Sequence, residues 1–546
     1  MHLSQTIGDG LRRVAVGRVL CIAALIMTAA SQAGGSTYPT LQICANSGVF
    51  QGACTLTSYS GVPGSTVYLL GEGFGNSSLV DLYFDNFVVA EVVTNPSGGT
   101  FAFALQISPT TPLGQHWITA VQQSSDVAAQ APVQIEDNWS AFRYSAVHRA
   151  DNPYESILNQ NTVGDIDVAW SYLTGGAITS SPVQLDTASV TFTLRGPEFI
   201  FDYDTYVGSW DNNVYDIDGV AGTLKWRFGT NGFVATTPAV SNGMVYIGSS
   251  DSNVYALRAA TGAEIWNHTT GSGVFSSPAV ANGTVYIGSN DFNLYALNAL
   301  TGSVVWSFAA ANNVATSPAV SDGRVYAASD DQVLHALNAS TGVQVWSADL
   351  SPALCVVVGV RRPTYVGSAV ISSAAVADGI VFVGVGNGVD ALNASTGAPI
   401  WSSGQLSTAT CAPTSSPALA NGVIYVGSQD NNLYALNART GAVLWNYTTG
   451  GAIDSSPAVA NGVAYVGSGD GYVYALNAST GALLWSFATG AAVESSPTIA
   501  NGTLYVGSDD NNLYAFNLAG GSQARTGVPK PDPSTLRPNL SLRAPK

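Results

Sequence analysis

Charged side chains make up only 10% of this 546-residue chain, and histidine and cysteine number five each. Scarce charge and abundant glycine, 58 residues, argue against salt-bridged helices and favour short strands joined by tight turns. No Cys-x-x-Cys spacing is present, so the usual zinc and haem-attachment signatures are missing. No Ser/His/Asp set or metal-binding histidine set can be identified either. We expect a nearly all-β protein with no catalytic residues and no metal site.

Basic residues are also scarce, and the formal net charge is −17. Residues 34–136 contain no Lys or Arg at all. Binding to a phosphate backbone requires a basic face, so nucleic acid is excluded as a partner. The negative charge is explained most simply as a means of keeping a glycine-rich surface soluble.

The N-terminal segment resembles an export signal. Arg12, Arg13 and Arg18 precede an apolar run at Val19–Ala30, and small residues follow up to Ala33. This order predicts a signal peptide at residues 1–33, cleaved after Ala33, because the apolar run is too short for a membrane span. We therefore expect an exported protein, either periplasmic or extracellular at the cell surface, with no transmembrane segment in the mature chain.

Four cysteines remain after this segment, an even number, as is usual in disulfide-bonded exported proteins. The pairing that respects the domain divisions is Cys44 with Cys54 and Cys355 with Cys411. The second pair would join equivalent loops of adjacent repeats, because each cysteine follows a repeat tryptophan by nine or ten residues.

Residues 34–136 carry alternating strand patterns separated by Gly, Asn, Ser and Pro. Such patterns predict a small antiparallel β-sandwich. The run from Pro63 to Val67 and the glycines from Gly71 to Gly75 resemble the opening of immunoglobulin-like domains of the IPT/TIG type. That resemblance implies an adhesive or spacer module.

Residues 137–161 are polar and irregular, and we interpret them as a linker. His148 and Arg149 lie in this stretch. An isolated histidine without a second titrating partner nearby is usually solvated or a surface hydrogen-bonder, and this is what we expect of His148.

From residue 162 onward one unit of about 40 residues recurs, for example at residues 274–306, and each copy reads as four short strands. A Ser-Ser-Pro-Ala-Val motif marks each copy, at Pro182, Pro238, Pro278, Pro318, Ala374 (a substituted copy), Pro417, Pro457 and Pro497. A tryptophan marks each fourth strand, at Trp170, Trp226, Trp266, Trp306, Trp346, Trp401, Trp445 and Trp485. We expect these tryptophans to wedge between neighbouring sheets as packing residues.

The offset between the two series predicts how the repeats close. Trp170 precedes the first proline motif, and the last copy has three strands with no tryptophan strand after it. The strand missing at one end is thus the spare strand at the other. We predict an eight-bladed β-propeller at residues 162–519, with four-stranded antiparallel blades and a ring closed by the N-terminal strand.

These repeats, with their A-x-T-G-x-x-x-W signature, resemble the pyrroloquinoline quinone (PQQ) repeat family. That family includes eight-bladed quinoprotein dehydrogenases and a non-enzymatic propeller that helps to assemble outer-membrane proteins. The resemblance implies the fold, and it allows PQQ with calcium as cofactors. The residues themselves predict no cofactor, because the adjacent-cysteine pair of the alcohol dehydrogenases is missing. Loops such as Asp291-Phe292-Asn293 are explained better by Asx-turns than by calcium binding.

Binding residues are expected on the face that carries the turns before the first strands, where the copies differ most. The position three residues before each proline should lie near the mouth of the central channel. Candidate ligand or partner contacts there are Thr179, Phe275, Thr414, Asp454 and Glu494. In the long insertion after Trp346, Arg361 and Arg362 form a further candidate, able to hold a carboxylate.

The tail at residues 520–546 is proline-rich and basic, and its composition predicts disorder. Together these features predict an exported, monomeric, non-catalytic propeller that binds a protein or a cell-envelope polymer through its loops and channel mouth. Two alternatives remain: a PQQ-dependent quinoprotein oxidoreductase and a carbohydrate-binding propeller.

Overall fold

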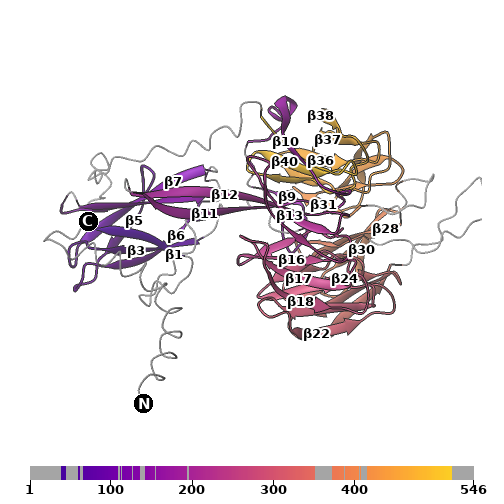
Figure 1. Ribbon diagram of the computed structural model, residues 1–546, viewed down its shortest axis with the longest axis horizontal. Helices are drawn as coiled ribbons and strands as arrows, with labels where there is room; N and C mark the ends of the chain where they lie inside the picture. The colour runs from indigo at the N-terminus through magenta and orange to yellow at the C-terminus, as the bar shows by residue number, and fades with distance from the viewer. Residues whose placement is uncertain are drawn as a thin grey trace, which may run out of the picture. The chain divides into compact units, whose positions relative to one another are not determined.

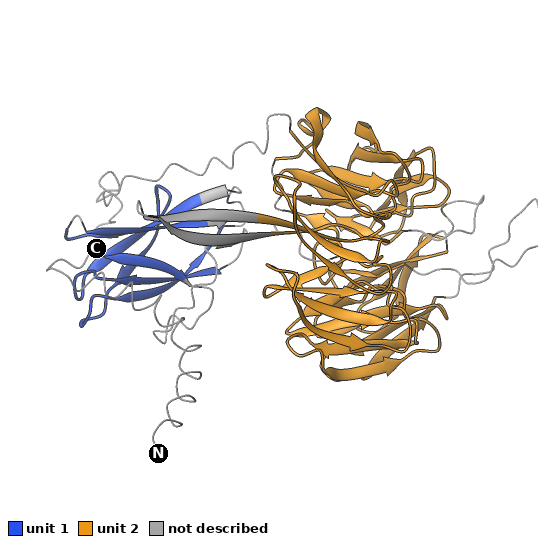
Figure 2. Cartoon of the chain, viewed as in Figure 1, with its two compact units in different colours: residues 1–135, 526–546 blue, residues 136–525 orange. Residues whose placement is uncertain are grey.

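The computed structural model describes residues 39–44, 60–61, 66–108, 111, 114–125, 127–135, 142–153, 155, 157–193, 196–350, 372–386, 388–404, 406 and 415–518. The predicted signal peptide, the basic tail, Cys54, Cys355 and Cys411 lie outside these residues. The chain divides into two compact units, residues 1–135 with 526–546 and residues 136–525 (Figure 2). In the described part, the helical element is the short 3₁₀ turn η2 (Val163–Asp165) amid forty-one strands, so the all-β prediction is confirmed. No described helix is long and apolar enough to cross a membrane.

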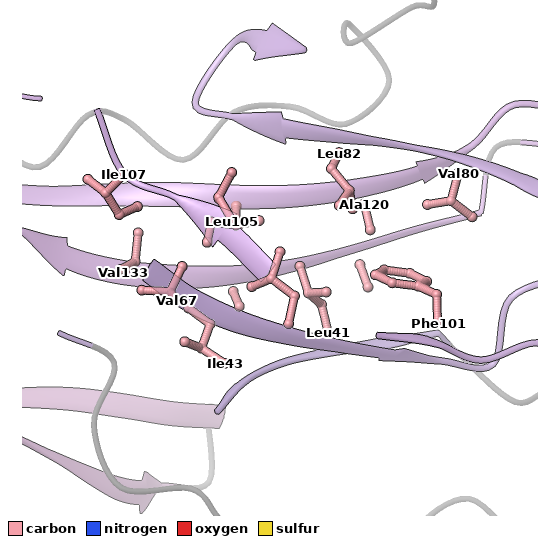
Figure 3. Close-up of a cluster of buried hydrophobic side chains, with 14 of the residues drawn as sticks. Leu41, Ile43, Val67, Val80, Leu82, Phe101, Leu105, Ile107, Ala120 and Val133 are labelled. Atoms are coloured by element: carbon pink, nitrogen blue, oxygen red, sulfur yellow. The ribbon is translucent and has the colours of Figure 1, made fainter. Parts of the chain in front are cut away.

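The first unit is a sandwich of two sheets. One sheet has the order β1 (Thr40–Cys44), β3 (Thr66–Glu72), β6 (Phe101–Gln106); the other has the order β2 (Ser60–Gly61), β8 (Ala128–Ile135), β7 (Gly114–Gln122), β4 (Leu79–Phe84), β5 (Phe87–Val93). Alternate residues of both sheets point inward, and Leu69, Leu82, Ile118 and Val133 are fully buried between them. Figure 3 labels Leu82 and Val133 together with other members of this core, such as Ile43 and Val67. The predicted sandwich is therefore present.

The second unit is built from successive antiparallel sheets, some of whose strands are labelled in Figure 1. There are eight such blades of four strands, and the seventh gains the short strand β9 (Asp151–Asn152) as a fifth. Blade 1 contains β11 (Val183–Thr193), β12 (Gly196–Gly208), β13 (Asn213–Asp218) and β14 (Leu224–Gly229), and blade 2 contains β15 (Ala239–Ser241), β16 (Met244–Gly248), β17 (Asn253–Arg258) and β18 (Glu264–Thr269). Blade 3 contains β19 (Ala279–Ala281), β20 (Thr284–Gly288), β21 (Asn293–Asn298) and β22 (Val304–Ala309). Blade 4 contains β23 (Ala319–Ser321), β24 (Arg324–Ser329), β25 (Val333–Asn338) and β26 (Gln344–Asp349). Blade 5 contains β27 (Ala375–Ala377), β28 (Ile380–Val385), β29 (Gly388–Asn393) and β30 (Pro399–Ser402). Blade 6 contains β31 (Ala418–Ala420), β32 (Val423–Gly427), β33 (Asn432–Asn437) and β34 (Val443–Thr448). Blade 7 contains β35 (Ala458–Ala460), β36 (Val463–Gly467), β37 (Tyr472–Asn477) and β38 (Leu483–Ala488).

Blade 8 joins the two ends of the repeat array. Its inner three strands are β39 (Thr498–Ala500), β40 (Thr503–Gly507) and β41 (Asn512–Leu518), and its outer strand is β10 (Ile166–Leu173), which pairs antiparallel with β41. Trp170 lies opposite Ala515 in this register. The first strand of blade 8 in turn lies beside the first strand of blade 1. This is the predicted closure of the ring by the N-terminal strand.

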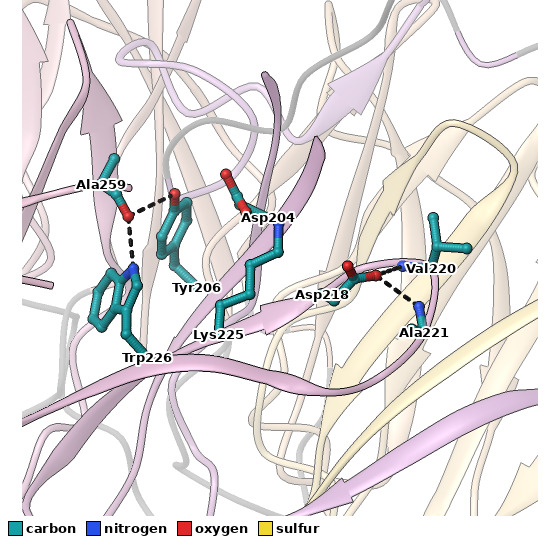
Figure 4. A network of polar contacts seen from close by, with 8 residues as sticks. All are labelled: Asp204, Tyr206, Asp218, Val220, Ala221, Lys225, Trp226 and Ala259. Atoms are coloured by element: carbon teal, nitrogen blue, oxygen red, sulfur yellow. Dashed lines mark hydrogen bonds and ion pairs between the residues drawn. The ribbon is translucent and has the colours of Figure 1, made fainter. Parts of the chain in front are cut away.

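The repeat tryptophans connect successive blades through a shared acceptor. In blade 1 the Trp226 indole N–H and the Tyr206 hydroxyl both donate to the carbonyl of Ala259 in blade 2, at 2.6 and 3.4 Å (Figure 4). Blade 2 repeats the arrangement with Trp266, Tyr246 and the Ala299 carbonyl. A glycine is required in the following Thr-Gly turn, because a Cβ on Gly302 would lie 2.6 Å from the Trp266 ring. The indole therefore packs on a backbone that has no side chain and at the same time donates a hydrogen bond across the blade boundary.

The second hydroxyl of each Ser-Ser-Pro motif closes a circle of hydrogen bonds around the centre of the ring. In every blade the backbone N–H at this position donates to the hydroxyl oxygen of the equivalent residue in the next blade, at 2.9 to 3.2 Å. The eight members, in order, are Ser181, Thr237, Ser277, Ser317, Ser373, Ser416, Ser456 and Ser496, and Ser496 donates back to Ser181. We call this set the hydroxyl circle.

Residues 142–152, here called the central segment, lie against the inner edges of blades 4 to 8. The carbonyls of Ala146, Val147, Arg149 and Ala150 accept the N–H groups of Val320, Val376, Leu419 and Val459, one blade after another. The segment ends in β9 (Asp151–Asn152), which pairs parallel with β35. The Asn152 side-chain amide then donates to the Ile499 carbonyl in blade 8. Each first strand would otherwise present an unpaired edge to the centre of the ring, and the central segment pairs five of these edges.

The expectation for His148 was wrong. Instead of being solvated in a linker, its ring is buried, with 1% of the residue exposed, and packs edge-on against Phe142 at 5.2 Å. The segment follows the curved inner wall by taking left-handed backbone conformations at Arg143, Tyr144, His148 and Ala150. None of these residues is glycine, so the composition gave no sign of the curvature. The segment contacts the blades through its backbone carbonyls. Because every residue type has a carbonyl, these contacts left no mark in the sequence.

The hydroxyl circle gives a direct stability prediction. Replacing Ser277 with Ala removes the acceptor of the Thr237 N–H in a buried position, so the free energy of unfolding should fall by about 1–3 kcal/mol. Ser277→Thr is the matched control, since blade 2 already carries Thr237 at this position. Denaturant unfolding measures both variants. Equal losses in the two variants would show that the hydroxyl is not what matters there.

Candidate functional site

Two sets of loops meet on one face of the ring, which we call the mouth face. These are the loops that precede each first strand and the loops between the second and third strands. The two sets are joined by backbone hydrogen bonds. The N–H groups of Trp210, Ser250 and Asp509 donate to the carbonyl oxygens of Ala177, Phe233 and Ala492, respectively. The Asn-Gly and Thr-Gly turns meet on the opposite face in the same way, for example through Ala299 N–H to the Gly283 carbonyl. The mouth face is where the copies differ in sequence.

An aromatic arc occupies the mouth face at blades 1 to 3. Trp210 stacks on Phe233, with ring centroids 4.7 Å apart and planes 22° apart, and Phe233 contacts Phe275 at 5.7 Å. The Trp210 indole N–H donates to the Thr179 hydroxyl at 2.9 Å, which fixes the orientation of the ring. Trp210 nevertheless remains 50% exposed and Phe275 37% exposed. The arc therefore offers a fixed, solvent-facing aromatic surface of the kind that binds apolar groups, cations or sugar rings.

An acidic arc lies at blades 7 and 8, next to the aromatic arc around the ring. It consists of Asp454, Glu494 and Asp509. Partial burial, and then the charges of Asp509 and Asp454, raise the pKa of Glu494. Partial burial, and then the charge of Asp510, raise the pKa of Asp509. The Gln429 amide of blade 6 donates to Asp454 at 2.9 Å. One carboxylate oxygen of Asp509 is buried without a hydrogen-bond partner, so the arc retains unused acceptor capacity.

The outer Asp-x-Asn loops are structural. In blade 3, one carboxylate oxygen of Asp291 accepts the Tyr295 hydroxyl and the Gly271 N–H, and the other accepts the Asn293 N–H. Burial acts to raise the pKa of Asp291, but these hydrogen bonds outweigh it, and the pKa is lowered. Asp251, Asp470 and Asp510 repeat the pattern. Their oxygens already have protein partners, which agrees with the interpretation as Asx-turns.

Four of the predicted contact residues therefore lie on the mouth face, in two groups: Thr179 and Phe275 in or beside the aromatic arc, and Asp454 and Glu494 in the acidic arc. Thr414, Arg361 and Arg362 lie outside the described residues. Sequence reasoning missed Trp210, Phe233 and Asp509. Trp210 could have been found, because the equivalent position holds Ser250, Asn290, Asp330, Gln429, Gly469 and Asp509 in other copies. A tryptophan in a column of small or polar residues is a departure from the repeat.

Behind the mouth, the central segment carries ionisable groups in unusual environments. Burial lowers the pKa of His148 to about 3, with the charge of Arg143 adding to the effect. Burial lowers the pKa of Arg143 to about 9. Burial raises the pKa of Asp151 to about 6, against the opposing charge of Arg149. Neutral His148 and ionised Asp151 are therefore expected in the folded protein at neutral pH.

Comparison with known proteins identifies the family. The profile of the PQQ_2 family, described as "Outer membrane protein assembly factor BamB", matches residues 194–274, 250–373, 364–452 and 448–542. The chain belongs to the PQQ_2 repeat family. Among curated proteins none matches its sequence.

Solved structures share the fold of this PQQ_2 propeller at low sequence identity. BamB from Moraxella catarrhalis is 19% identical, with a TM-score of 0.50 and coverage of 64% of this chain and 99% of that chain. A quinohemoprotein alcohol dehydrogenase from Comamonas testosteroni is 15% identical, with a TM-score of 0.56 and coverage of 70% and 81%. A computationally designed protein, Ika8, is 17% identical, with a TM-score of 0.51 and coverage of 63% and 97%. These likenesses establish the fold alone.

The family includes quinone-dependent enzymes, so we tested whether the mouth of this PQQ_2 propeller suits PQQ with calcium. The acidic arc has the same sign of charge as the carboxylates of the quinone. Among the described residues, no group of three His, Cys, Asp or Glu side chains is placed to hold a metal ion.

Two of the shifted groups of the central segment, His148 and Asp151, predict opposite effects of pH on stability. Below pH 6.5 the unfolded chain protonates His148 and the folded chain does not, so this group costs about 2 kcal/mol by pH 5. Asp151 acts in reverse, because its folded pKa of about 6 favours the folded state as pH falls. Between pH 7 and pH 5, His148→Gln should gain stability relative to the wild type, and Asp151→Asn should lose it.

Urea unfolding at several pH values measures both slopes. Parallel pH profiles for the two variants and the wild type would contradict the buried placement of these groups.

Proposed function

We propose that this protein is an exported, non-catalytic binding propeller whose mouth face takes hold of a positively charged segment of a partner protein. The observation that carries the proposal is the adjacency of the two arcs. An exposed aromatic stack at Trp210, Phe233 and Phe275 lies beside the carboxylates of Asp454, Glu494 and Asp509. Lys and Arg side chains suit such a surface, since their charges pair with carboxylates and their heads stack on aromatic rings.

The charge of the chain supports a basic partner. The net charge of −17 attracts a basic segment at a distance and repels acidic ones. The blade interiors offer no competing chemistry, because their tryptophan, tyrosine and serine side chains are used in packing and in hydrogen bonds between blades. Membership of a family described by an outer-membrane assembly factor is compatible with protein binding in the cell envelope.

Carbohydrate binding is the second candidate, favoured by one observation. The stacked pair Trp210–Phe233 leaves an indole face half exposed and held in place by Thr179, as a sugar-binding platform requires. A sugar polymer would use the aromatic arc with little help from the acidic arc. The two candidates therefore differ in which arc binding depends on.

Titration of Trp fluorescence with defined ligands separates the candidates. Peptides that combine Lys or Arg with aromatic residues, matched peptides with Glu in place of the basic residues, and neutral sugar oligomers are compared. We expect the basic peptides alone to bind, and we expect Trp210→Ala and the double variant Asp454→Asn/Glu494→Gln each to weaken binding about tenfold or more. Leu300→Ala, an exposed apolar residue in a Thr-Gly turn, is the control and should bind normally.

Other outcomes would redirect the assignment. Binding of neutral sugars that depends on Trp210 but not on the carboxylates would establish the carbohydrate candidate instead. Retention of PQQ after incubation with the quinone and calcium, together with dye-linked oxidation of alcohols or sugars, would overturn the non-catalytic assignment.

A further inference from the structure

Strand β5 of the sandwich combines a free strand edge with an exposed apolar surface. It ends its sheet in the order β2, β8, β7, β4, β5, so no described strand pairs with its outer side. Phe87 is 77% exposed and Val93 is 62% exposed, and Val88 and Val89 between them are also exposed. An apolar edge strand with neither proline nor lysine is a template on which a further strand can pair.

The two faces of β5 set different requirements for such a strand. Ala90 and Val92 pack against the sandwich core and are only partly buried, so the core is incompletely covered at this edge. Glu91 lies between them in sequence and is exposed, as expected for a side chain on the outer face. Residues on neighbouring strands that lie opposite each other share a face. A further strand therefore needs apolar residues for the inner face and a polar or charged residue for the outer face.

Glu91 belongs to a pair of carboxylates that lacks a cation. It lies opposite Asp81 of β4 in the strand register. The side-chain amide of Gln123 donates to both carboxylates, at 2.7 Å to Glu91 and 2.8 Å to Asp81. Like charges directly opposite each other are destabilising, and residues 34–136 contain no Lys or Arg to compensate them. The edge therefore favours a strand that carries a positive charge.

The C-terminal tail at residues 520–546 has this chemistry in its sequence. Between Pro538 and Pro545 it reads Asn-Leu-Ser-Leu-Arg-Ala, in which two leucines alternate with Ser541 and Arg543. Such alternation is typical of a strand with one apolar face. Residues 519–538 can span about 65 Å when extended, which gives this stretch a long reach. Basic residues predominate in the tail; they are Arg525, Lys530, Arg537, Arg543 and Lys546, against Asp532.

We propose that residues 539–544 pair with β5 and add a sixth strand to its sheet. The two leucines of this stretch lie beside Ala90 and Val92 and extend the apolar inner face. Arg543 lies on the outer face, where its guanidinium pairs with the Glu91 carboxylate. Backbone hydrogen bonds hold the added strand, and its tether to the chain raises its effective concentration at the edge. This docking belongs to the sandwich and is independent of the ligand of the mouth face.

A second copy of the chain is the other strand donor that an apolar edge could accept. Its β5 would bring another Glu91 to an edge that already holds two carboxylates. Repulsion between these like charges opposes that pairing, whereas the basic tail relieves the repulsion. The tail is therefore the occupant that the charges favour.

Hydrogen–deuterium exchange of the full-length protein measures whether β5 is covered. Alternate amides of an edge strand point away from the neighbouring strand, so those of β5 exchange fast unless a further strand pairs with them. We expect β5 of the wild type to exchange about tenfold more slowly than in Leu540→Asp/Leu542→Asp or in a chain that ends at Ala519. Strand β3 of the same sandwich should exchange equally in all three proteins, which verifies that the fold is retained.

Charge variants test the predicted pairing of Arg543 with Glu91. Arg543→Glu should lose most of the protection of β5, because it adds a third carboxylate to the edge. Lys530→Glu is the matched control, since it changes the charge of the tail equally but lies outside residues 539–544. It should exchange as the wild type does. Glu91→Arg combined with Arg543→Glu should restore the protection.

Three results would overturn the proposal. One is equal exchange of β5 in the wild type and in Leu540→Asp/Leu542→Asp, whether fast or slow. The second is equal loss of protection in Arg543→Glu and Lys530→Glu, which would remove the pairing with Glu91. The third is slow exchange that survives removal of the tail and increases with protein concentration, which would assign the edge to a second copy of the chain.

Discussion

The ring depends on one hydrogen bond repeated eight times, from the N–H of one motif hydroxyl residue to the side-chain oxygen of the next. The repetition is closed, because Ser496 donates to Ser181 and the first blade thereby meets the last. A linear array would leave an unpaired donor at one end and an unused acceptor at the other. Closure removes both, and it explains why every copy carries a hydroxyl here even where the proline is replaced, as at Ser373-Ala374. The Trp–Tyr–carbonyl contacts at the outer strands then hold the same blades together at larger radius.

The ring leaves the inner edges of its first strands facing the centre, and residues 142–152 cover most of them. This places the central segment inside the propeller. The chain leaves it toward the face opposite the mouth face, where Glu155, three residues beyond the segment, accepts the Gly502 N–H of an Asn-Gly turn. On the mouth face, side chains that differ between the copies, such as Trp210, remain in contact with solvent. Residues that recur in every copy hydrogen-bond backbone groups and fill the interfaces between blades. Residues that depart from the repeat, such as Trp210 and Glu494, stay in contact with solvent.

Much of this architecture could be predicted from the sequence, because its causes recur. Eight prolines or their substitutes, eight tryptophans and the offset of Trp170 determine the number of blades and the closure of the ring. Two of the mouth residues, Asp454 and Glu494, could be placed together because they occupy one column in adjacent copies. The position of residues 142–152 could not be predicted, since their contacts run through backbone carbonyls and their left-handed residues are not glycine. Arg143 gave no signal for the same reason: its burial depends on a path that the residue types do not encode.

The occupation of the ring by residues 142–152 underlies the pH behaviour expected of His148 and Asp151. Hydrogen–deuterium exchange of the folded protein tests it most directly. If the segment lies inside the ring, its amides that donate internally, such as those of His148 and Ala150, and the paired amides of Val320, Val376, Leu419 and Val459 should exchange as slowly as those of the buried strand β16. Exchange of residues 142–152 as fast as that of the exposed Asn-Gly turns would contradict the account.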